Sequence, residues 1–323
     1  MLLIKNNPYR TVGLLVGATA KEQERQIRRL KQFIEAEQEP QDDFSFPKLG
    51  HLHRTIESVT DAASKLNLDR DKMNAALFWF YNGSHTDEPA FDALKEGNLQ
   101  EASRIWGTKT SEREVAEYNM SAFQNISTLM LHAAFEEVTI SETILEKGIR
   151  YKLKFLESDF IKDFKTLVTD ETFKTTKKEL QLLFLDQVQS EIEKHGGIST
   201  DKYLEILNKQ NFSAKEEVLK NFILKPIEQI EKRIEEAKTN RKQDKAKAVA
   251  IGKALNEQTL VNLKRLKSIL GASNIKYVSI ADKVANEILQ CSIDHFNYYQ
   301  ENESDINYFE PAWNLAKSAE GIA

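Results

Sequence analysis

Apolar residues recur along most of the chain at intervals of three and four, the spacing that puts them on one face of an α-helix. The first stripe is Ile27, Leu30 and Ile34, and the second is Ile56, Val59, Ala63 and Leu66. Further stripes run through residues 73–80, 115–129, 149–167, 180–192, 227–234, 260–270, 280–293 and 315–322. The pattern predicts an all-α fold.

Helix boundaries are marked by capping residues, glycines and prolines. Three Ser/Thr-x-x-Glu sequences have the form of a capping box and predict helix starts. They are Thr19 with Glu22, Ser111 with Glu114, and Ser213 with Glu216. Gly196-Gly197 and Gly271 predict helix ends, and Pro226 predicts either the start of a helix or a kink within one.

Residues 90–106 predict a helical hairpin. A short helix precedes the turn at Gly97-Asn98, and a second helix carries Leu99, Ala102 and Ile105. This turn resembles the inter-helix turn of a tetratricopeptide repeat, in which an alanine lets two helices approach closely. Random helical hairpins often match this single copy. For the rest of the chain we expect helical hairpins and long helices, arranged either like tetratricopeptide repeats or as a bundle.

We expect three regions: residues 1–110, a long-helix middle region 111–240, and a C-terminal helical region 241–323. The segment from Glu39 to His53 contains two prolines and a glycine and is predicted to be a loop. The boundary between the middle and the C-terminal region is placed near the basic stretch from Lys238 to Lys247. This stretch is either a solvated helix or a linker.

Composition and charge narrow the class of partner. The chain has 12 Gly and 6 Pro in 323 residues, which favours helices. Its net charge of -5 argues against nucleic acid as the main partner, because phosphate binding draws on clustered Lys and Arg. The apolar run at Met1–Ile4 is too short for a signal peptide or a membrane span, and the single Cys291 fits a reducing compartment. We therefore expect a cytoplasmic protein.

Motifs that carry catalytic chemistry are largely missing from the sequence. It has no phosphate-binding glycine loop, dinucleotide-binding fingerprint or nucleophile elbow. His51-Leu52-His53 is a close histidine pair but lacks the companion spacing of a zinc signature. The pairs Glu136-Glu137 and Glu235-Glu236 diverge around their predicted helices. We expect no catalytic residue, no metal and no cofactor, and an enzyme remains a third class of hypothesis.

Four consecutive aromatic residues, Phe78 to Tyr81, cannot all face one core if they lie on one helix. The favoured interpretation is a helix packed between neighbours on several sides. The alternative is an exposed binding patch, which makes Trp79 and Tyr81 candidate partner-binding residues.

The N-terminal region carries a family resemblance. Asn7-Pro8-Tyr9-Arg10-Thr11-Val12-Gly13-Leu14, followed by Ala18-Thr19-Ala20-Lys21-Glu22 and a basic amphipathic helix, resembles the opening of a J-domain. Residues 54–80 look like its third helix and beyond. With residues 91–99 and, more loosely, 281–291, the chain is similar to bacterial DnaJ-related proteins that join a degenerate J-like module to tetratricopeptide-like helices.

This resemblance implies a chaperone-related setting. J-domains present basic charge on the second helix, which here would be Arg25, Arg28, Arg29 and Lys31. The resemblance implies that these side chains bind a protein partner, either a DnaK-type chaperone or a client. The loop Glu39–His53 lacks the His-Pro-Asp tripeptide of a working J-domain, and His85-Thr86-Asp87 comes too late.

Two hypotheses follow for the whole chain. The first is a non-enzymatic, chaperone-associated adaptor that binds a partner through a J-like module and helical repeats. The alternative is a helical scaffold subunit of a larger assembly, such as a bacterial defence complex, with no chaperone role.

Overall fold

The computed structural model describes residues 1–38, 40, 43–136, 138–302 and 307–322, and within them the fold is all-α, as expected. In this part of the chain the β structure is a single bridge between Val16 and Tyr81. None of the helices formed by the described residues is both long and apolar enough to cross a lipid bilayer.

The chain forms two compact units, Met1–Lys215 and Glu216–Ala323, which differ from the three regions expected. Residues 1–110 and 111–215 share one core, because the helix Met120–Ala134 packs against the helix before it and against residues 76–81. No boundary falls near residue 240, because the helix that crosses this position buries Ile230 and Ala237 against the helices that follow.

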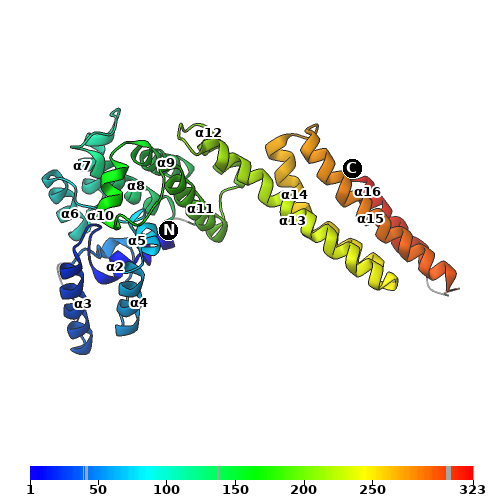
Figure 1. Cartoon of the computed structure of the whole chain (residues 1–323), viewed down its shortest axis with the longest axis horizontal. Coiled ribbons are helices and arrows are strands. Elements are labelled where there is room, and N and C mark those ends of the chain that lie inside the picture. The colour runs from blue at the N-terminus through cyan, green and yellow to red at the C-terminus, as the bar shows by residue number, and fades with distance from the viewer. Residues whose placement is uncertain (39, 41–42, 137, 303–306, 323) are drawn as a thin grey trace. The chain divides into compact units, whose positions relative to one another are not determined.

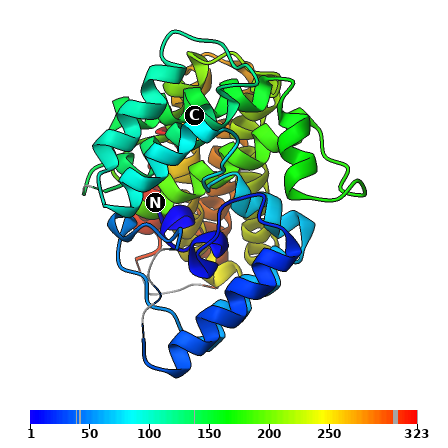
Figure 2. The same cartoon turned by 90° about the vertical axis from the view of Figure 1, so that its left-hand side faces the viewer.

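The first unit is built mainly of short helices (Figure 1). They are α1 (Leu2–Lys5), α2 (Pro8–Val12), α3 (Ala20–Glu35), α4 (Ile56–Leu66), α5 (Asp69–Ala76), α6 (Glu88–Lys95), α7 (Leu99–Thr110), α8 (Met120–Ala134), α9 (Glu142–Glu157), α10 (Ile161–Val168), α11 (Lys177–His195) and α12 (Thr200–Asn208), with 3₁₀ turns η1 (Pro47–Leu49) and η2 (His85–Asp87). Helices α3 and α4 lie side by side at one edge of this unit, as Figures 1 and 2 show.

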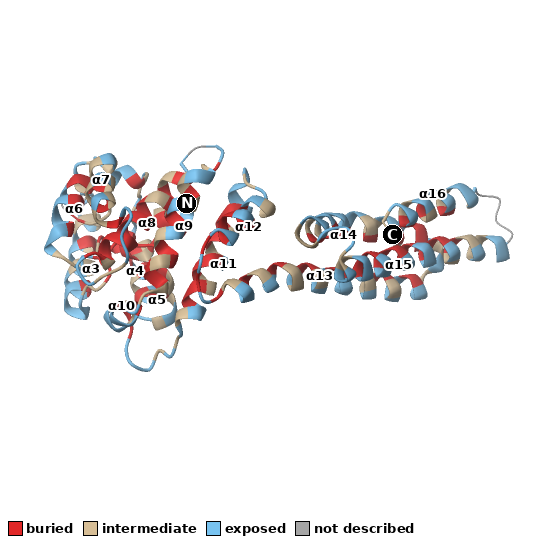
Figure 3. Cartoon of the chain, turned by 90° about the horizontal axis from the view of Figure 1, so that it is seen from above, coloured by how far each residue is buried: buried red, intermediate tan, exposed pale blue. Residues whose placement is uncertain are grey.

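Helix α8 is the centre of the first unit. It packs against α7 and α9, and nearly all of its residues are buried, including polar ones (Figure 3). A helix buried on every side cannot be amphipathic in the ordinary sense, so its position is not readable from one apolar stripe.

The predicted hairpin is present as α6 and α7, which pack against each other. Gly97 has a φ of 82°, which a residue without a Cβ adopts at little cost, and Ala102 is fully buried.

Three predicted elements are wrong in detail. The helix expected over residues 73–80 ends at Ala76, so residues 78–81 are not helical. Ser111 follows the last residue of α7 instead of starting a helix, and the next helix begins at Met120. The single helix expected over 149–167 is broken between α9 and α10, where Ser158 has extended backbone.

The second unit contains α13 (Lys215–Gln243), η3 (Lys245–Lys247), α14 (Ala248–Leu270), α15 (Ile275–Glu301) and α16 (Phe309–Glu320). Helix α13 starts at Lys215, and the hydroxyl of Ser213 donates to Glu157 instead of capping it. Pro226 lies inside this helix. The helix runs to Gln243, so most of the basic stretch from Lys238 to Lys247, expected to be either a solvated helix or a linker, is helical.

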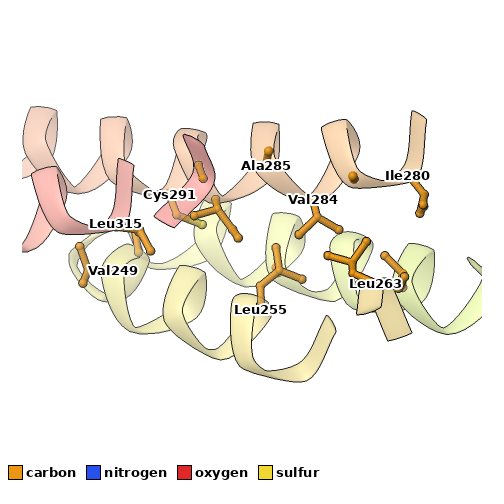
Figure 4. Packing of buried hydrophobic residues seen from close by; sticks show 14 of the residues in the cluster. Val249, Leu255, Leu263, Ile280, Val284, Ala285, Cys291 and Leu315 are labelled. Carbon is orange, nitrogen blue, oxygen red and sulfur yellow. The ribbon is translucent and has the colours of Figure 1, made fainter. Parts of the chain in front are cut away.

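The core of the second unit lies between α13, α14, α15 and α16 (Figure 4). Gly252 lets the helices approach closely, since a Cβ there would stand 2.6 Å from Leu315 Cδ2 and 3.0 Å from Cys291 Cβ. Arg241 of α13 donates to Glu287 at 2.8 Å and also pairs with Asp294 on α15. This largely buried ion-pair cluster ties α13 to α15.

Candidate protein-binding surface

Helix α3 begins at a true capping box. The hydroxyl of Thr19 accepts from the Glu22 amide at 3.3 Å, and the Thr19 amide donates to the Glu22 carboxylate at 2.8 Å. Hydrogen bonds from the Thr19 backbone and hydroxyl lower the pKa of Glu22 below its usual value. The cap therefore fixes where α3 starts and which residues face outward.

One side of α3 packs against α2 and α4. Leu30 is fully buried there, and Gln23 is buried and donates to the Ala18 carbonyl at 2.8 Å. Ile27 and Ile34 lie partly buried on the same side. The opposite side of α3 is left to solvent.

The predicted cations lie mainly on that outer side. Arg25, Arg28 and Arg29 are exposed, and Lys31 is only partly exposed. Helix geometry puts Arg25 and Arg28 opposite Leu30, and it puts Arg29 and Lys31 about 100° to either side of Leu30. Lys31 lies on the same side as Ile27, one turn away, so it is closer to the packed side than Arg29 is. We call Arg25, Arg28 and Arg29 the basic face of α3.

The three arginines differ in how they are held. Arg28 pairs with Glu24 at 2.7 Å, although both side chains are more than two-thirds exposed. Arg29 lies over the ring of Phe33 at 5.4 Å from the centroid. Arg25 has no ion pair with any residue in the described part of the chain. Because an exposed ion pair contributes about 0–1 kcal/mol, Arg28 can exchange Glu24 for another carboxylate at little cost.

A cleft of about 1010 Å³ lies next to this helix, between the end of α3, the loop after it and the start of α4. Its wall contains Arg10, which is almost fully buried and donates to the carbonyls of Ser45 and Lys5 at 2.8 Å each. Burial and the nearby charge of Arg54 lower the pKa of Arg10 to about 10.

Arg54 completes this cluster. It pairs with the buried Asp43 at 2.7 Å and donates to the Thr11 carbonyl at 2.7 Å. The two guanidinium groups thus hold the loop against α2. His51 and His53 are exposed at the cleft. Among the described residues, no group of three or more His, Cys, Asp or Glu side chains is placed to hold a metal ion.

Trp79 and Tyr81 do not belong to a binding surface, so their assignment as partner-binding residues is wrong. Both are buried, with 0% and 4% of their surface exposed. The Trp79 indole donates to the Leu14 carbonyl at 2.7 Å, and Asn125 pairs with both backbone groups of Tyr81 at 2.9 Å. Burial raises the pKa of Tyr81 to about 12. The favoured interpretation, burial on several sides, is correct, although the segment is not a helix.

This non-helical segment is held by polar residues that belong to no motif in the sequence. Gln124 donates to the carbonyls of Ala76 and Trp79 at 2.9 and 2.8 Å. The ammonium of Lys152 donates to the Leu77 carbonyl at 2.6 Å and to Gln124 at 2.5 Å. Lys152 is fully buried, which lowers its pKa well below the usual value. The one indication in the sequence that Lys152 is buried is its position beside the apolar residues 149 and 153 of the same stripe.

Comparison of the chain with known protein families, with curated proteins and with solved structures finds no match.

Proposed function

We propose that this chain is a non-enzymatic, chaperone-associated adaptor that binds an acidic surface of a partner protein through the basic face of α3. The observation that carries the proposal is the exposure of Arg25, Arg28 and Arg29 on the side of α3 opposite its packed side. The J-like order of the first helices suggests a DnaK-type chaperone as the partner, with the remaining helices holding a client.

The physical case rests on the type and arrangement of charge. Arginine presents several donors that match a carboxylate, and it is weakly hydrated, so it suits protein interfaces. The chain as a whole carries a net charge of -5. A local basic face on an acidic protein directs an acidic partner to one helix and raises the association rate.

The test is binding of the full-length chain to a purified DnaK-type chaperone, measured at low and moderate salt. A variant with Arg25, Arg28, Arg29 and Lys31 changed to Glu should lose at least tenfold in affinity, since several charge contacts are reversed. The matched control changes four exposed lysines of the second unit to Glu, namely Lys220, Lys253, Lys264 and Lys276. Absence of binding, or equal loss in both variants, would contradict the proposal.

The alternative is a helical scaffold subunit without a chaperone role. The lack of His-Pro-Asp between α3 and α4 favours it, because stimulation of chaperone ATP hydrolysis depends on that tripeptide in working J-domains. Affinity purification from the native host distinguishes the two. A stable complex without any DnaK-type chaperone supports the scaffold.

A further inference from the structure

Four large apolar side chains of the second unit are exposed together. Leu289 and Ile293 of α15 are each 39% exposed, Phe309 of α16 is 61% exposed and Trp313 is 53% exposed. The rings of Phe309 and Trp313 stack with centroids 6.3 Å apart. Single exposed apolar residues are ordinary, but a Trp and a Phe stacked at the surface are typical of an interaction site.

The contacts between the two helices show how these side chains are arranged. The hydroxyl of Ser292 donates to the Ala312 carbonyl at 2.7 Å, and the ring of Phe296 lies 6.4 Å from that of Phe309. These two contacts define an antiparallel pairing in which α15 residues near 292 lie opposite α16 residues near 312.

The helix α14 lies on one side of this pairing, against Cys291 and Leu315, which both approach Gly252. At 3.6 residues per turn, Cys291 projects from one side of Ser292 around the α15 axis, and Leu289 and Ile293 project from the other side. In the same way, Leu315 projects from one side of Ala312 around the α16 axis, and Phe309 and Trp313 project from the other side. The four residues therefore line both sides of the α15–α16 contact, on the face that α14 does not cover. We call them the outer seam.

Charged residues are unequally distributed around the outer seam. Asp282 of α15 and Glu320 of α16 are exposed, and the antiparallel pairing brings them to the same end. Neither has an ion-pair partner in the part of the chain that the structure describes. The basic side chain near the seam is Lys317, which lies over Trp313 at 5.5 Å.

We propose that the outer seam binds an amphipathic helix of a partner protein, whose apolar stripe is flanked by Lys and Arg. The apolar stripe would cover the exposed rings and aliphatic side chains, as when an amphipathic helix occupies the groove between two helices. Basic side chains on its flank would reach Asp282 and Glu320 while their aliphatic stems stay on the apolar surface. This surface lies in the second unit, and the proposal stands independently of the role proposed for α3.

A second copy of the chain fits the outer seam less well. A twofold axis parallel to the helices would bring the acidic ends of the two copies together. An axis perpendicular to them would set the end with Asp282 and Glu320 against the end with Phe296 and Phe309 of the other copy. That end has no Lys or Arg between residues 296 and 310. This segment offers the two carboxylates no cation, so a second copy would match them less well than a helix flanked by Lys and Arg.

The test uses the full-length chain and two designed 18-residue helical peptides with the same leucine stripe, one with Lys and one with Glu on the flanks. Trp79 and Trp106 are 0% exposed, so a shift of tryptophan emission to shorter wavelength on binding reports Trp313. Affinities come from the anisotropy of fluorescein-labelled peptides. We expect the Lys peptide to bind with this shift and the Glu peptide to bind at least tenfold more weakly.

Variants locate the site. Ile293→Ser and Glu320→Lys should each weaken the Lys peptide about tenfold, because each removes or reverses one contact at the seam. Val261→Ser changes a 73% exposed apolar residue of α14 in the same unit and should leave the affinity unchanged.

Three results would overturn the proposal. They are no binding of either peptide, equal binding of both, and a dimer in light scattering that Ile293→Ser dissociates. The last result would identify a second copy as the occupant. Circular dichroism of each variant excludes loss of folding as the cause of a lost signal.

Discussion

At the scale of single residues, the buried Lys152 acts as a hydrogen-bond donor for main chain that is not helical. A buried irregular segment must have its carbonyls satisfied by side chains, because neither water nor a helix supplies donors. Lys152 and Gln124 provide donors for residues 76–79. They allow the aromatic residues 78–81 to pack without helical geometry.

We predict that Lys152→Met lowers the free energy of unfolding by about 1–3 kcal/mol, because the Leu77 carbonyl and the Gln124 side-chain oxygen lose their donor. Lys147→Met, at an exposed position of the same helix, should change it by less than about 0.5 kcal/mol. Urea unfolding followed by circular dichroism measures both. Equal effects of the two variants would show that Lys152 is not needed as a donor.

His132 of α8 makes stability depend on pH. Its side chain has 0% of its surface exposed, and burial, with the positive charges of the N-terminal amino group, Lys5 and Arg10, lowers its pKa to about 3. The Glu136 carboxylate stands 3.0 Å from Nε2. The folded state therefore keeps His132 neutral where the unfolded chain would bind a proton.

The sign of the pH effect follows from that difference. The folded pKa is below the unfolded value of 6.5, so the contribution is complete above pH 6.5 and is lost as the pH falls toward 3. The loss is about 1.4 kcal/mol per pH unit at most, or about 3 kcal/mol between pH 6.5 and 4. Urea unfolding at several pH values gives the free energy of unfolding as a function of pH. Between pH 6.5 and 4 this free energy should fall less steeply in His132→Leu than in the natural chain. His85→Leu, at a fully exposed side chain, should keep the slope of the natural chain.

At the scale of elements, the close approach of α14, α15 and α16 depends on Gly252. A methyl group there would overlap Leu315, so the helices must separate or Leu315 must change its rotamer. A glycine within a helix ordinarily costs stability relative to alanine. Its presence at this position is explained by the space that the packing requires.

We predict that Gly252→Ala destabilises the second unit by about 1–3 kcal/mol, the usual range for overpacking. Gly107→Ala is the matched control, because the new Cβ would meet only Ile126 Cδ1 at 3.8 Å and the residue is helical. It should stabilise by about 0.5–1 kcal/mol. Thermal unfolding measures both, and a stabilising Gly252→Ala would contradict the packing argument.

At the scale of the whole molecule, the two units have separate cores. Each core is large enough to support its own unfolding transition. Trp79 and Trp106 lie in the first unit and Trp313 in the second. Tryptophan emission and calorimetry together therefore distinguish the unfolding of the first unit from that of the second.

We predict two transitions, of which Lys152→Met shifts only that of the first unit and Gly252→Ala only that of the second. Differential scanning calorimetry of the two variants and the natural chain tests this. A single transition that both variants lower by the same amount would mean that the chain unfolds as one cooperative unit.

The sequence by itself determined the elements whose evidence is local. The apolar stripes of α3, α11, α14 and α15, the capping box at Thr19 and the helix ends at Gly196 and Gly271 were all predicted. Propensity, periodicity and capping act within a few residues, so they can be read from the chain. The exposed side of α3, with Arg25, Arg28 and Arg29, followed from the same periodicity.

Only the tertiary structure decided the features that depend on distant partners. Helix α5 ends at Ala76 because side chains from more than forty positions later form hydrogen bonds with the backbone groups at its end and in the segment that follows. These side chains are Gln124, Asn125 and Lys152. The same contacts bury Trp79 and Tyr81, whose residue types are compatible with a core as well as with a surface. The outer seam likewise depends on which faces of α15 and α16 their neighbours cover. Hydrogen bonds and packing between distant segments leave no periodic signal in the sequence, so these outcomes required the fold.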